Sequence, residues 1–205
     1  MASTGRSGRL VHQSAIALAI AFAADAQPAF AQVFGSRTNP CVIKQAAQCA
    51  HANLVRANLP GKNLSLANLS GANLSAANLL GATLMGAHLQ NANLQGANLQ
   101  RANLGSATMT WCKMQGALLQ RAILQNANLS NADLQQANLA VASLGAANLT
   151  NANLRGANLF GANMAGAKIQ HTNFSGATWF NGAVCQEGSI GECRLPTWTG
   201  PPKKQ

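Results

Sequence analysis

The chain contains 205 residues, of which 14 are Lys or Arg and 4 are Asp or Glu, so its formal net charge is +10 at neutral pH. Only 9% of its residues are charged and Tyr is absent, whereas roughly 25% of an ordinary soluble domain is charged. Abundant apolar residues argue against intrinsic disorder, and four carboxylates leave little material for acid–base catalysis. So biased a composition is typical of a repeat protein.

Residues 1–31 have the pattern of an export signal. Arg6 and Arg9 precede an apolar stretch of about ten residues, and the small-x-small tripeptide AFA ends the segment. We predict cleavage before Gln32, which would place the mature chain in the bacterial periplasm or outside the cell. An uncleaved membrane anchor is the alternative, but the apolar stretch is shorter than the roughly 20 residues that span a bilayer. After cleavage, no membrane span is expected.

From residue 52 to residue 186 the sequence advances in steps of five. Apolar residues recur at every fifth position from Leu54 to Val184, and 20 of these 27 positions are Leu. Ala lies two residues before the apolar residue in 23 of the 27 units, and Asn lies directly before it in 16. A period of five is neither helical nor that of a simple strand. Each unit has one small and one large inward position, so it must stack on copies of itself to bury them.

This pattern resembles the pentapeptide repeat family, whose consensus is A-(N/D)-L-x-x. Runs such as ANLSGANLSAANL and ANLTNANLRGANLFGANM match it. The resemblance implies an all-β fold, a right-handed quadrilateral parallel β-helix in which residue n lies over residue n+20. At four units per coil, the 27 units give about 6.75 coils and a length of roughly 32 Å. Residues 32–51 and 187–205 are then the N-terminal cap segment and the C-terminal cap and tail.

Two pairs of cysteines with the spacing C-x7-C flank the repeat. In an exported protein, an even set of cysteines indicates disulfides. Pairing between the two ends would need Cα atoms within about 7 Å, whereas the ends lie roughly 32 Å apart. We therefore expect the disulfides Cys41–Cys49 and Cys185–Cys193; a zinc site is disfavoured because its ligands would have to cluster. The residues expected to cover the ends of the β-helix are Val42, Ile43, Ile190, Leu195 and Trp198.

The fifth cysteine of the mature chain, Cys112, occupies an inward position that Ala normally fills. We interpret it as a buried, reduced thiol that packs as a small apolar group. A redox role would require exposure and a lowered pKa, for which the sequence offers no argument.

The remaining reactive side chains form no recognisable catalytic or metal site. In the stacked arrangement no two of the mature His residues, His51, His88 and His171, could share a metal. Asp133 is the single acidic residue of the repeat, and the capping loop that carries Glu187 and Glu192 offers no groove for hydrolysis by two carboxylates. We therefore predict a protein that is not an enzyme and that has no cofactor and no metal.

Unusual residues on the outer surface form the candidate interaction surface. Arg101 and Arg121 are 20 residues apart, so they stack as adjacent cations, and Phe160 and Phe180 stack likewise on the neighbouring column. Leu118 and Ile123 replace the usual polar residue. Such a patch can mark a partner surface, although scattered apolar surface residues are also normal. The candidate residues are Leu80, Arg101, Trp111, Leu118, Arg121, Phe160 and Phe180.

These observations favour a non-enzymatic scaffold or interaction protein of the periplasm or cell exterior. Its partner would be an unknown protein or an anionic envelope component, and an oligomer is possible. The alternative is mimicry of DNA towards gyrase, since the resemblance includes acidic family members of that kind. Here the repeat has a net charge of +6, and both that sign and the export signal disfavour this alternative. Nucleic-acid binding is not expected, since the cations form no stripe, and irregular outer columns disfavour ice binding.

Overall fold

The structure, a computed structural model, describes residues 33–34 and 41–195. Two short strands, β1 (Val33–Phe34) and β2 (Cys41–Val42), form an antiparallel pair. After β2, the described chain consists of turns and single-residue bridges and contains no helix. Within these residues, no helix has the length and hydrophobicity that crossing a membrane requires. The expected signal segment 1–31 and the final residues 196–205, including Trp198, lie outside the described residues.

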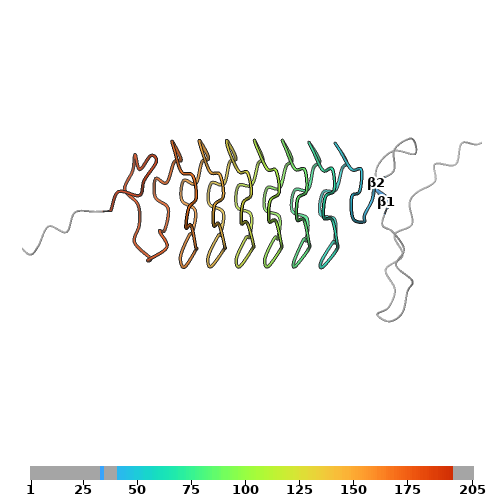
Figure 1. The fold of residues 1–205 in the computed structure, drawn as a ribbon, viewed down its shortest axis with the longest axis horizontal. Helices are drawn as coiled ribbons and strands as arrows, with labels where there is room; N and C mark the ends of the chain where they lie inside the picture. The colour runs from blue at the N-terminus through green and yellow to red at the C-terminus, as the bar shows by residue number, and fades with distance from the viewer. Residues whose placement is uncertain (1–32, 35–40, 196–205) are drawn as a thin grey trace, which may run out of the picture. The chain divides into compact units, whose positions relative to one another are not determined.

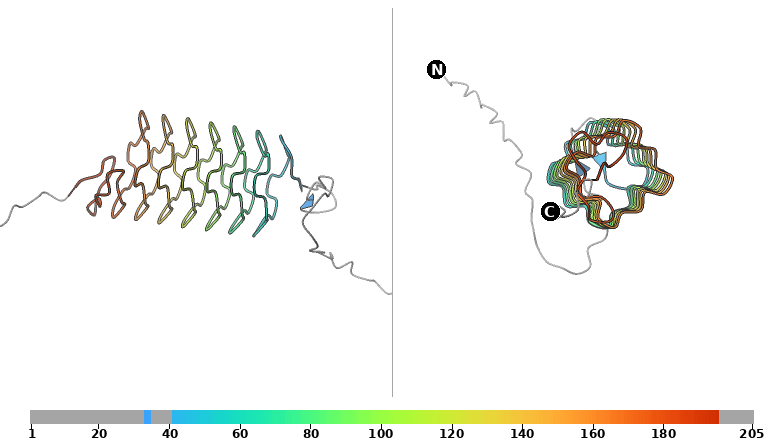
Figure 2. Two further views of the ribbon diagram at one scale, coloured as in Figure 1. Left: turned by 90° about the horizontal axis from the view of Figure 1, so that it is seen from below. Right: turned by 90° about the vertical axis from the view of Figure 1, so that its left-hand side faces the viewer.

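Successive coils of the chain stack with a spacing of 20 residues. Parallel bridges join residue n to residue n+20, from Gln48↔Asn68 to Asn158↔Thr178. Figure 1 shows these coils side by side, and the right-hand view of Figure 2 looks along them and shows a four-cornered outline. Four five-residue units therefore make one coil, as the sequence predicts.

The core is built from the two inward positions of each unit. Every large apolar side chain from Leu54 to Leu159 is at most 1% exposed, including Met109 and Met114. The Ala side chains between them are buried as well, with Ala57 at 5% and Ala162 at 8% as the most exposed of the buried set. The small and large positions therefore alternate in a continuous core along the coil axis.

Neighbouring coils are joined by backbone hydrogen bonds along the axis. The amide of Leu54 donates to the carbonyl of Asn73 at 2.7 Å, and the amide of Asn73 donates back to the carbonyl of Ala52 at 2.9 Å. A third bond runs from the amide of the corner residue Arg56 to the carbonyl of Ser75 at 2.9 Å. The same three bonds recur in most units, so each interior coil is paired on both sides.

Each corner of the coil is a β-turn that requires a left-handed residue. The amide of Ala57 donates to the carbonyl of Leu54 at 3.0 Å, and the residue before Ala57 has φ = +55°. A positive φ at the third residue is the signature of a type II turn, which favours Gly there. This explains the abundance of Gly, but 17 non-Gly residues also have positive φ, among them the β-branched Val141 at +60°. A β-branched side chain at such a φ is unfavourable.

The Asn of the repeat pairs the one amide that the coils leave free. The Oδ1 atom of Asn63, for example, accepts a hydrogen bond from the amide of Ser65 at 3.0 Å. Fifteen of the sixteen Asn residues at this position make this bond, and so does Asp133. The exception is Asn58, because Pro60 has no amide hydrogen to donate. The Asn therefore completes the backbone hydrogen bonding of its unit.

Replacing Asn148 with Ala should lower the free energy of unfolding by about 1 kcal/mol, because the amide of Thr150 loses its 3.1 Å acceptor. The matched control is Asn58→Ala, for which we expect a loss below about 0.5 kcal/mol, since no backbone amide depends on that side chain and its Oδ1 atom accepts only an exposed bond from the Asn78 side chain at 2.9 Å. Urea unfolding of both variants measures the difference. Equal losses would show that the bond does not stabilise the turn.

The parallel stack begins earlier than the predicted boundary at residue 52. Gln48 already pairs with Asn68, and Ala47 and Cys49 are buried in the small and large inward positions. Cys49 forms the predicted disulfide with Cys41, with a Cα–Cα distance of 4.8 Å. The disulfide sulfur takes the place of a Leu side chain in the core, so the unit with Cys49 at its large inward position does not match the A-N-L pattern.

The parallel stack also ends earlier than the sequence predicts, at Thr178. The paired positions run from residue 48 to residue 178 in steps of five and make 27 units, so the stack has the predicted 6.75 coils but lies one unit nearer the N-terminus than the predicted series. The chain reverses where Gly182 replaces Ala with φ = +88°, and the amide of Trp179 bonds to the carbonyl of Ala183 at 2.7 Å. The interpretation of Val184 as an inward residue is therefore wrong, because its side chain is 54% exposed.

After this reversal the chain runs back over the last coil as the C-terminal cap. Antiparallel bridges join Thr178 to Val184 and Asn173 to Ile190. The predicted disulfide Cys185–Cys193 closes the segment, with a Cα–Cα distance of 5.1 Å. Cys185 and Ser189 are buried, whereas Ile190 and Leu195 remain 46% and 42% exposed. Ile190 and Leu195 are therefore not buried at this end as expected, and the third expected residue, Trp198, lies outside the described residues.

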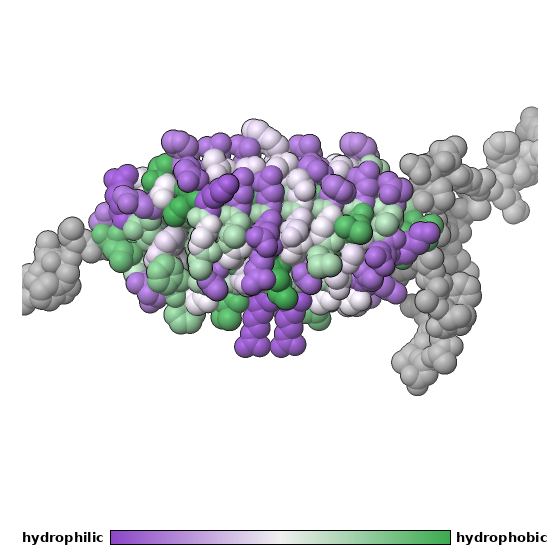
Figure 3. Space-filling view, viewed as in Figure 1, coloured by the Kyte–Doolittle hydropathy of each residue, from purple (hydrophilic) through white to green (hydrophobic). Residues whose placement is uncertain are grey.

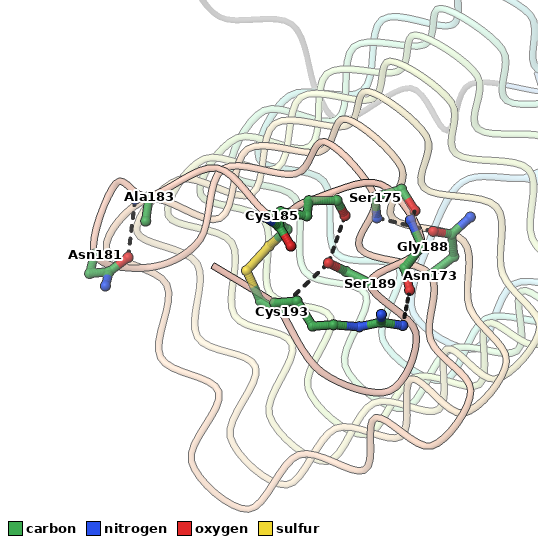
Figure 4. Close-up of a disulfide and its surroundings, with 10 residues drawn as sticks. Asn173, Ser175, Asn181, Ala183, Cys185, Gly188, Ser189 and Cys193 are labelled. Carbon is green, nitrogen blue, oxygen red and sulfur yellow. Dashed lines mark hydrogen bonds between the residues drawn. A yellow bond between two sulfur atoms is a disulfide. The ribbon is translucent and has the colours of Figure 1, made fainter. Parts of the chain in front are cut away.

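Ser189 organises the cap around the disulfide, as Figure 4 shows. Its hydroxyl donates to the carbonyl of Gln186 at 2.7 Å and accepts from the amide of Arg194 at 3.2 Å. The hydroxyl of Ser175, on the last coil, accepts from the amide of Gly188 at 3.0 Å. These bonds attach the disulfide loop to the end of the stack.

Candidate interaction surface

The candidate surface residues, except Trp111, lie along one edge of the coils. Leu80, Phe160 and Phe180 follow the same large apolar position on one side, and they belong to one column because their numbers differ by multiples of 20. Their side chains are 40%, 55% and 48% exposed. The Arg101 and Arg121 positions form the adjoining corner column, both with positive φ. The stacking that the sequence predicts for these positions follows from the 20-residue register.

A further exposed apolar residue, Val141, extends the Arg column. It lies one coil beyond Arg121, and a Cβ atom added to Gly161, one coil further, would lie 3.5 Å from the Val141 Cγ2 atom. The sequence contained the signal, since Val141 follows Arg121 by 20 residues. The exposed Ile123 lies directly beyond this corner, on the next side of the coil. We call Leu80, Arg101, Leu118, Arg121, Ile123, Val141, Phe160 and Phe180 the corner surface.

Trp111 does not belong to the corner surface. Its amide bonds to the carbonyl of Ser130, which places it in the corner column of His51 and His171. That column is two corners away around a four-cornered coil, so it lies on the opposite edge. The structure therefore places Trp111 apart from the other candidates, although its side chain is exposed as expected.

Leu118 and Ile123 stand where most units have an Asn that pairs a backbone amide, although several other units of the stack also lack that Asn or an Asp. Among the described residues, the amides of Gln120 and Gln125 have no hydrogen-bond acceptor. The Oε1 atom of Gln120 is buried and also lacks a partner there. Both apolar side chains remain exposed, Leu118 at 37% and Ile123 at 40%. These two positions therefore give up a turn bond without gaining a buried side chain.

The cations of the corner surface have no acidic partner in the described part of the chain. The single ion pair within residues 41–195 joins Arg155 to Glu187 at 2.7 Å, on exposed side chains elsewhere. The space-filling view in Figure 3 shows hydrophobic and hydrophilic residues intermixed on one face of the stack, with no continuous apolar sheet. The arrangement can present both charge and apolar contacts to a partner.

Two of the acidic residues make contacts within the stack and its cap. Asp133 takes the role of the repeat Asn and also accepts hydrogen bonds from the amide groups of Gln115 and Gln135. Glu187 pairs with Arg155. Within the described residues, no three His, Cys, Asp or Glu side chains are grouped so that they could hold a metal ion.

Cys112 is buried in the small inward position, as the sequence predicts. It is 1% exposed, and its thiol donates to the carbonyl of Leu89 at 2.8 Å. Burial raises the pKa of this thiol from its ordinary value of 9.0 to about 12. Thr172, in an equivalent position, donates to the carbonyl of Leu149 at 2.7 Å. A polar atom at this position is thus satisfied by the backbone of the preceding coil.

The folded protein should resist a thiol-specific disulfide reagent at pH 8 and react with one equivalent after unfolding, because the pKa of the Cys112 thiol is raised to about 12. The unfolded chain loses this proton near pH 9, so stability is unaffected below that pH and falls as pH rises towards 12. Comparison with Cys112→Ala isolates the effect from other groups. Rapid labelling of the folded chain would contradict the burial.

The model of the family "Pentapeptide repeats" matches residues 47–84, 67–105, 102–140 and 142–178, with eight copies. These residues make up more than half of the chain, so the protein belongs to the pentapeptide repeat family. Members of this family are typically non-enzymatic. The structure agrees with the repeat assignment, because all these segments lie in the stacked coils.

Several solved structures of pentapeptide repeat proteins are similar to this chain. HetL, which is involved in regulating heterocyst differentiation in the cyanobacterium Nostoc, is 35% identical over 70% of this chain and 66% of its own, with a TM-score of 0.39. A protein from the Arabidopsis thaliana thylakoid lumen is 32% identical over 53% and 68%, with a TM-score of 0.33. Rfr23 from the cyanobacterium Cyanothece is 32% identical over 62% and 87%, with a TM-score of 0.35. No curated protein matches the sequence.

Proposed function

We propose that this protein is a non-enzymatic interaction protein of an oxidising compartment, exported by the signal in residues 1–31. The two disulfides support such a compartment, because disulfides persist where thiols are not kept reduced. We also propose that the chain coils as a right-handed β-helix, as the family resemblance implies. The stacked coils would serve as a rigid support for the corner surface.

The observation that carries the proposal is the replacement of Asn by Leu118 and Ile123. Asn at these positions would pair the amides of Gln120 and Gln125, as it does in fifteen other units. Exposed apolar side chains bring no comparable gain to the free protein. We infer that they contribute to binding instead.

The chemistry of the corner surface favours a partner protein with acidic groups beside an apolar patch. Arg101 and Arg121 lie on adjacent coils and can bind carboxylates through charge-assisted hydrogen bonds. Leu118, Ile123 and Val141 supply apolar contact area around them. Exposed arginines surrounded by apolar residues are typical of interface centres.

Site-specific photocrosslinking tests this proposal in the oxidised protein. A photoreactive residue at Leu118 should capture a partner from envelope extract, and the same residue at Asn153, on a different side of the coils, should capture roughly tenfold less. The double variant Leu118→Asn/Ile123→Asn should lower the affinity for that captured protein at least roughly tenfold. Equal capture at the two positions would contradict the proposal.

The double variant is informative because it should not destabilise the fold. The introduced Asn side chains can accept from the amides of Gln120 and Gln125, so the free energy of unfolding should stay constant or rise. A loss of binding then reports the surface itself. If no protein is captured and the unmodified chain binds an anionic polymer of the envelope, the partner is that polymer and the proposed protein partner is wrong.

A further inference from the structure

The C-terminal cap pairs with only half of the last coil. On this half, the amides of Phe174 and Gly176 donate to the carbonyls of Ser189 and Cys185 at 2.8 and 2.9 Å. Antiparallel bridges accompany these bonds. The edge of the last coil therefore accepts an added segment of chain by strand pairing.

The other half of the last coil, residues 162–171, is left without such a segment; we call it the open edge. One coil earlier, the amides of Leu144 and Leu149 donate to the carbonyls of Asn163 and Lys168 at 2.7 Å. Among the described residues, the equivalent amides of the open edge have no acceptor, and two carbonyls that are paired in interior coils accept no bond. The unpaired amides belong to Met164, Gly166, Ile169 and His171, and the unpaired carbonyls belong to Ala162 and Ala167.

An apolar pocket of about 420 Å³ adjoins the open edge, and its lining includes the side chains of Met164, Ile169, Trp179 and Phe180. Met164 and Ile169 occupy large inward positions but are only partly buried, whereas Leu144, one coil before Met164, is fully buried. The pocket is therefore the uncovered end of the core. Its volume is within the range of sites that bind ligands.

We propose that the open edge binds an extended segment of a partner protein by strand addition, with an aromatic side chain of that segment in the pocket. Addition of a strand to an unpaired sheet edge is a general mode of peptide recognition, in which the backbone supplies affinity and pockets select side chains. The cap uses the same pairing on the covered half of the coil.

The pairing geometry directs one side chain of the bound segment into the pocket. In the stack, the two carbonyls that accept from the preceding coil, those of Asn163 and Ala165, lie on either side of the inward Met164. A bound strand that pairs in this way also has one inward residue between two outward ones. The pocket suits an aromatic residue, because Trp179 and Phe180, whose ring centroids are 5.3 Å apart, offer rings for stacking. β-branched neighbours would favour the extended conformation.

Amide hydrogen exchange of the oxidised protein tests the proposal with a defined probe, the end-blocked peptide Thr-Thr-Trp-Thr-Thr. At saturating peptide, exchange at Met164 and Gly166 should slow at least roughly tenfold. Exchange at Phe174 and Gly176 should not change, because the cap already pairs these amides. Equal exchange at Met164 and Gly166 with and without peptide would overturn the proposal.

Two altered peptides separate the pocket from the backbone pairing. The peptide with Ser in place of Trp should bind at least roughly tenfold more weakly, because the pocket stays empty. The peptide N-methylated on both sides of Trp cannot donate to the carbonyl of Ala162 and should bind at least roughly fivefold more weakly. If the N-methylated peptide keeps its affinity, the pocket binds a side chain alone and strand addition is wrong.

Met164→Gln should lower the affinity for the unaltered peptide at least roughly fivefold, because it places a polar amide group in the pocket. The matched control is Met85→Gln at a residue that is 51% exposed and does not line the pocket, so its affinity should not change. Equal affinities would overturn the proposal, and if Met164→Gln does not fold, the exchange experiment on the unmodified chain decides.

The protein without peptide provides the last control. Slow exchange at Met164 and Gly166 in the free protein would overturn the proposal, because the open edge would then already be covered. Slowing that grows with protein concentration would likewise overturn it, since the occupant would then be a second copy of the chain.

Discussion

Replacing Leu119 with Ala should lower the free energy of unfolding by about 3 kcal/mol, whereas replacing Leu118 with Ala should change it by less than about 0.5 kcal/mol. The two residues are adjacent and chemically identical. Leu119 is fully buried in a large inward position of a central coil, while Leu118 is 37% exposed. Urea unfolding of the two variants under the same conditions measures the contrast.

The cost at Leu119 has two sources. The deleted methyl groups lose their burial, and the neighbouring coils cannot collapse into the cavity because their backbones are fixed by hydrogen bonds on both sides. The Leu118 variant controls for composition and helps to separate stability from binding, since it removes part of the corner surface alone. A larger loss at Leu118 than at Leu119 would mean that the repeat register is shifted by one residue, and similar losses would contradict the placement of Leu118 on the surface.

The interior of the stack could be predicted from the sequence because its code is local and repeated. The five-residue period assigns Leu119 to the core and Leu118 to the surface without any knowledge of distant contacts. The assignment of Cys112 to a small buried position follows from the same register. The role of Asn was only partly predictable, since its pairing with the amide two residues later depends on the turn geometry.

The ends of the stack could not be predicted in the same way, because the five-residue pattern of the sequence continues beyond the last stacked coil. Val184 keeps the apolar period, yet the reversal around Gly182 turns its side chain into solvent. Cys49 breaks the pattern, yet it occupies a core position. At an end there is no next coil to impose the register, so the disulfide loops decide the path of the chain.

The candidate surface could be predicted for residues that share one column, which are spaced by 20. Residues 20 apart stack, which correctly joined Arg101 with Arg121. Trp111 lies apart from the other candidates because two corners of the coil separate its column from that of Arg121. The strongest signal is a departure from the code, since Leu118 and Ile123 replace a residue that stabilises most other turns. Positions that give up stability in a regular repeat are the first candidates for binding.

The double variant Cys185→Ser/Cys193→Ser should lose about 2.6 kcal/mol of unfolding free energy, because a bridge that closes a nine-residue loop restricts the unfolded chain by that amount. The Cys41–Cys49 loop has the same length, so its entropic contribution should be equal. Its removal should cost more, since both of its sulfur atoms are buried and serine would place hydroxyls in the core. Urea unfolding without reductant measures both losses.

Cys112→Ser provides the matched control for these substitutions. Its hydroxyl can donate to the carbonyl of Leu89, as the hydroxyl of Thr172 donates to the carbonyl of Leu149, so the loss should stay below about 1 kcal/mol. The order of loss should therefore be the N-terminal pair, then the C-terminal pair, then Cys112. An unfolding midpoint of the unmodified chain that does not change with reductant would show that the bridges do not stabilise the fold. The reverse order of the two pairs would mean that the cap over the last coil, rather than the sulfur atoms in the first, limits the stability of the stack.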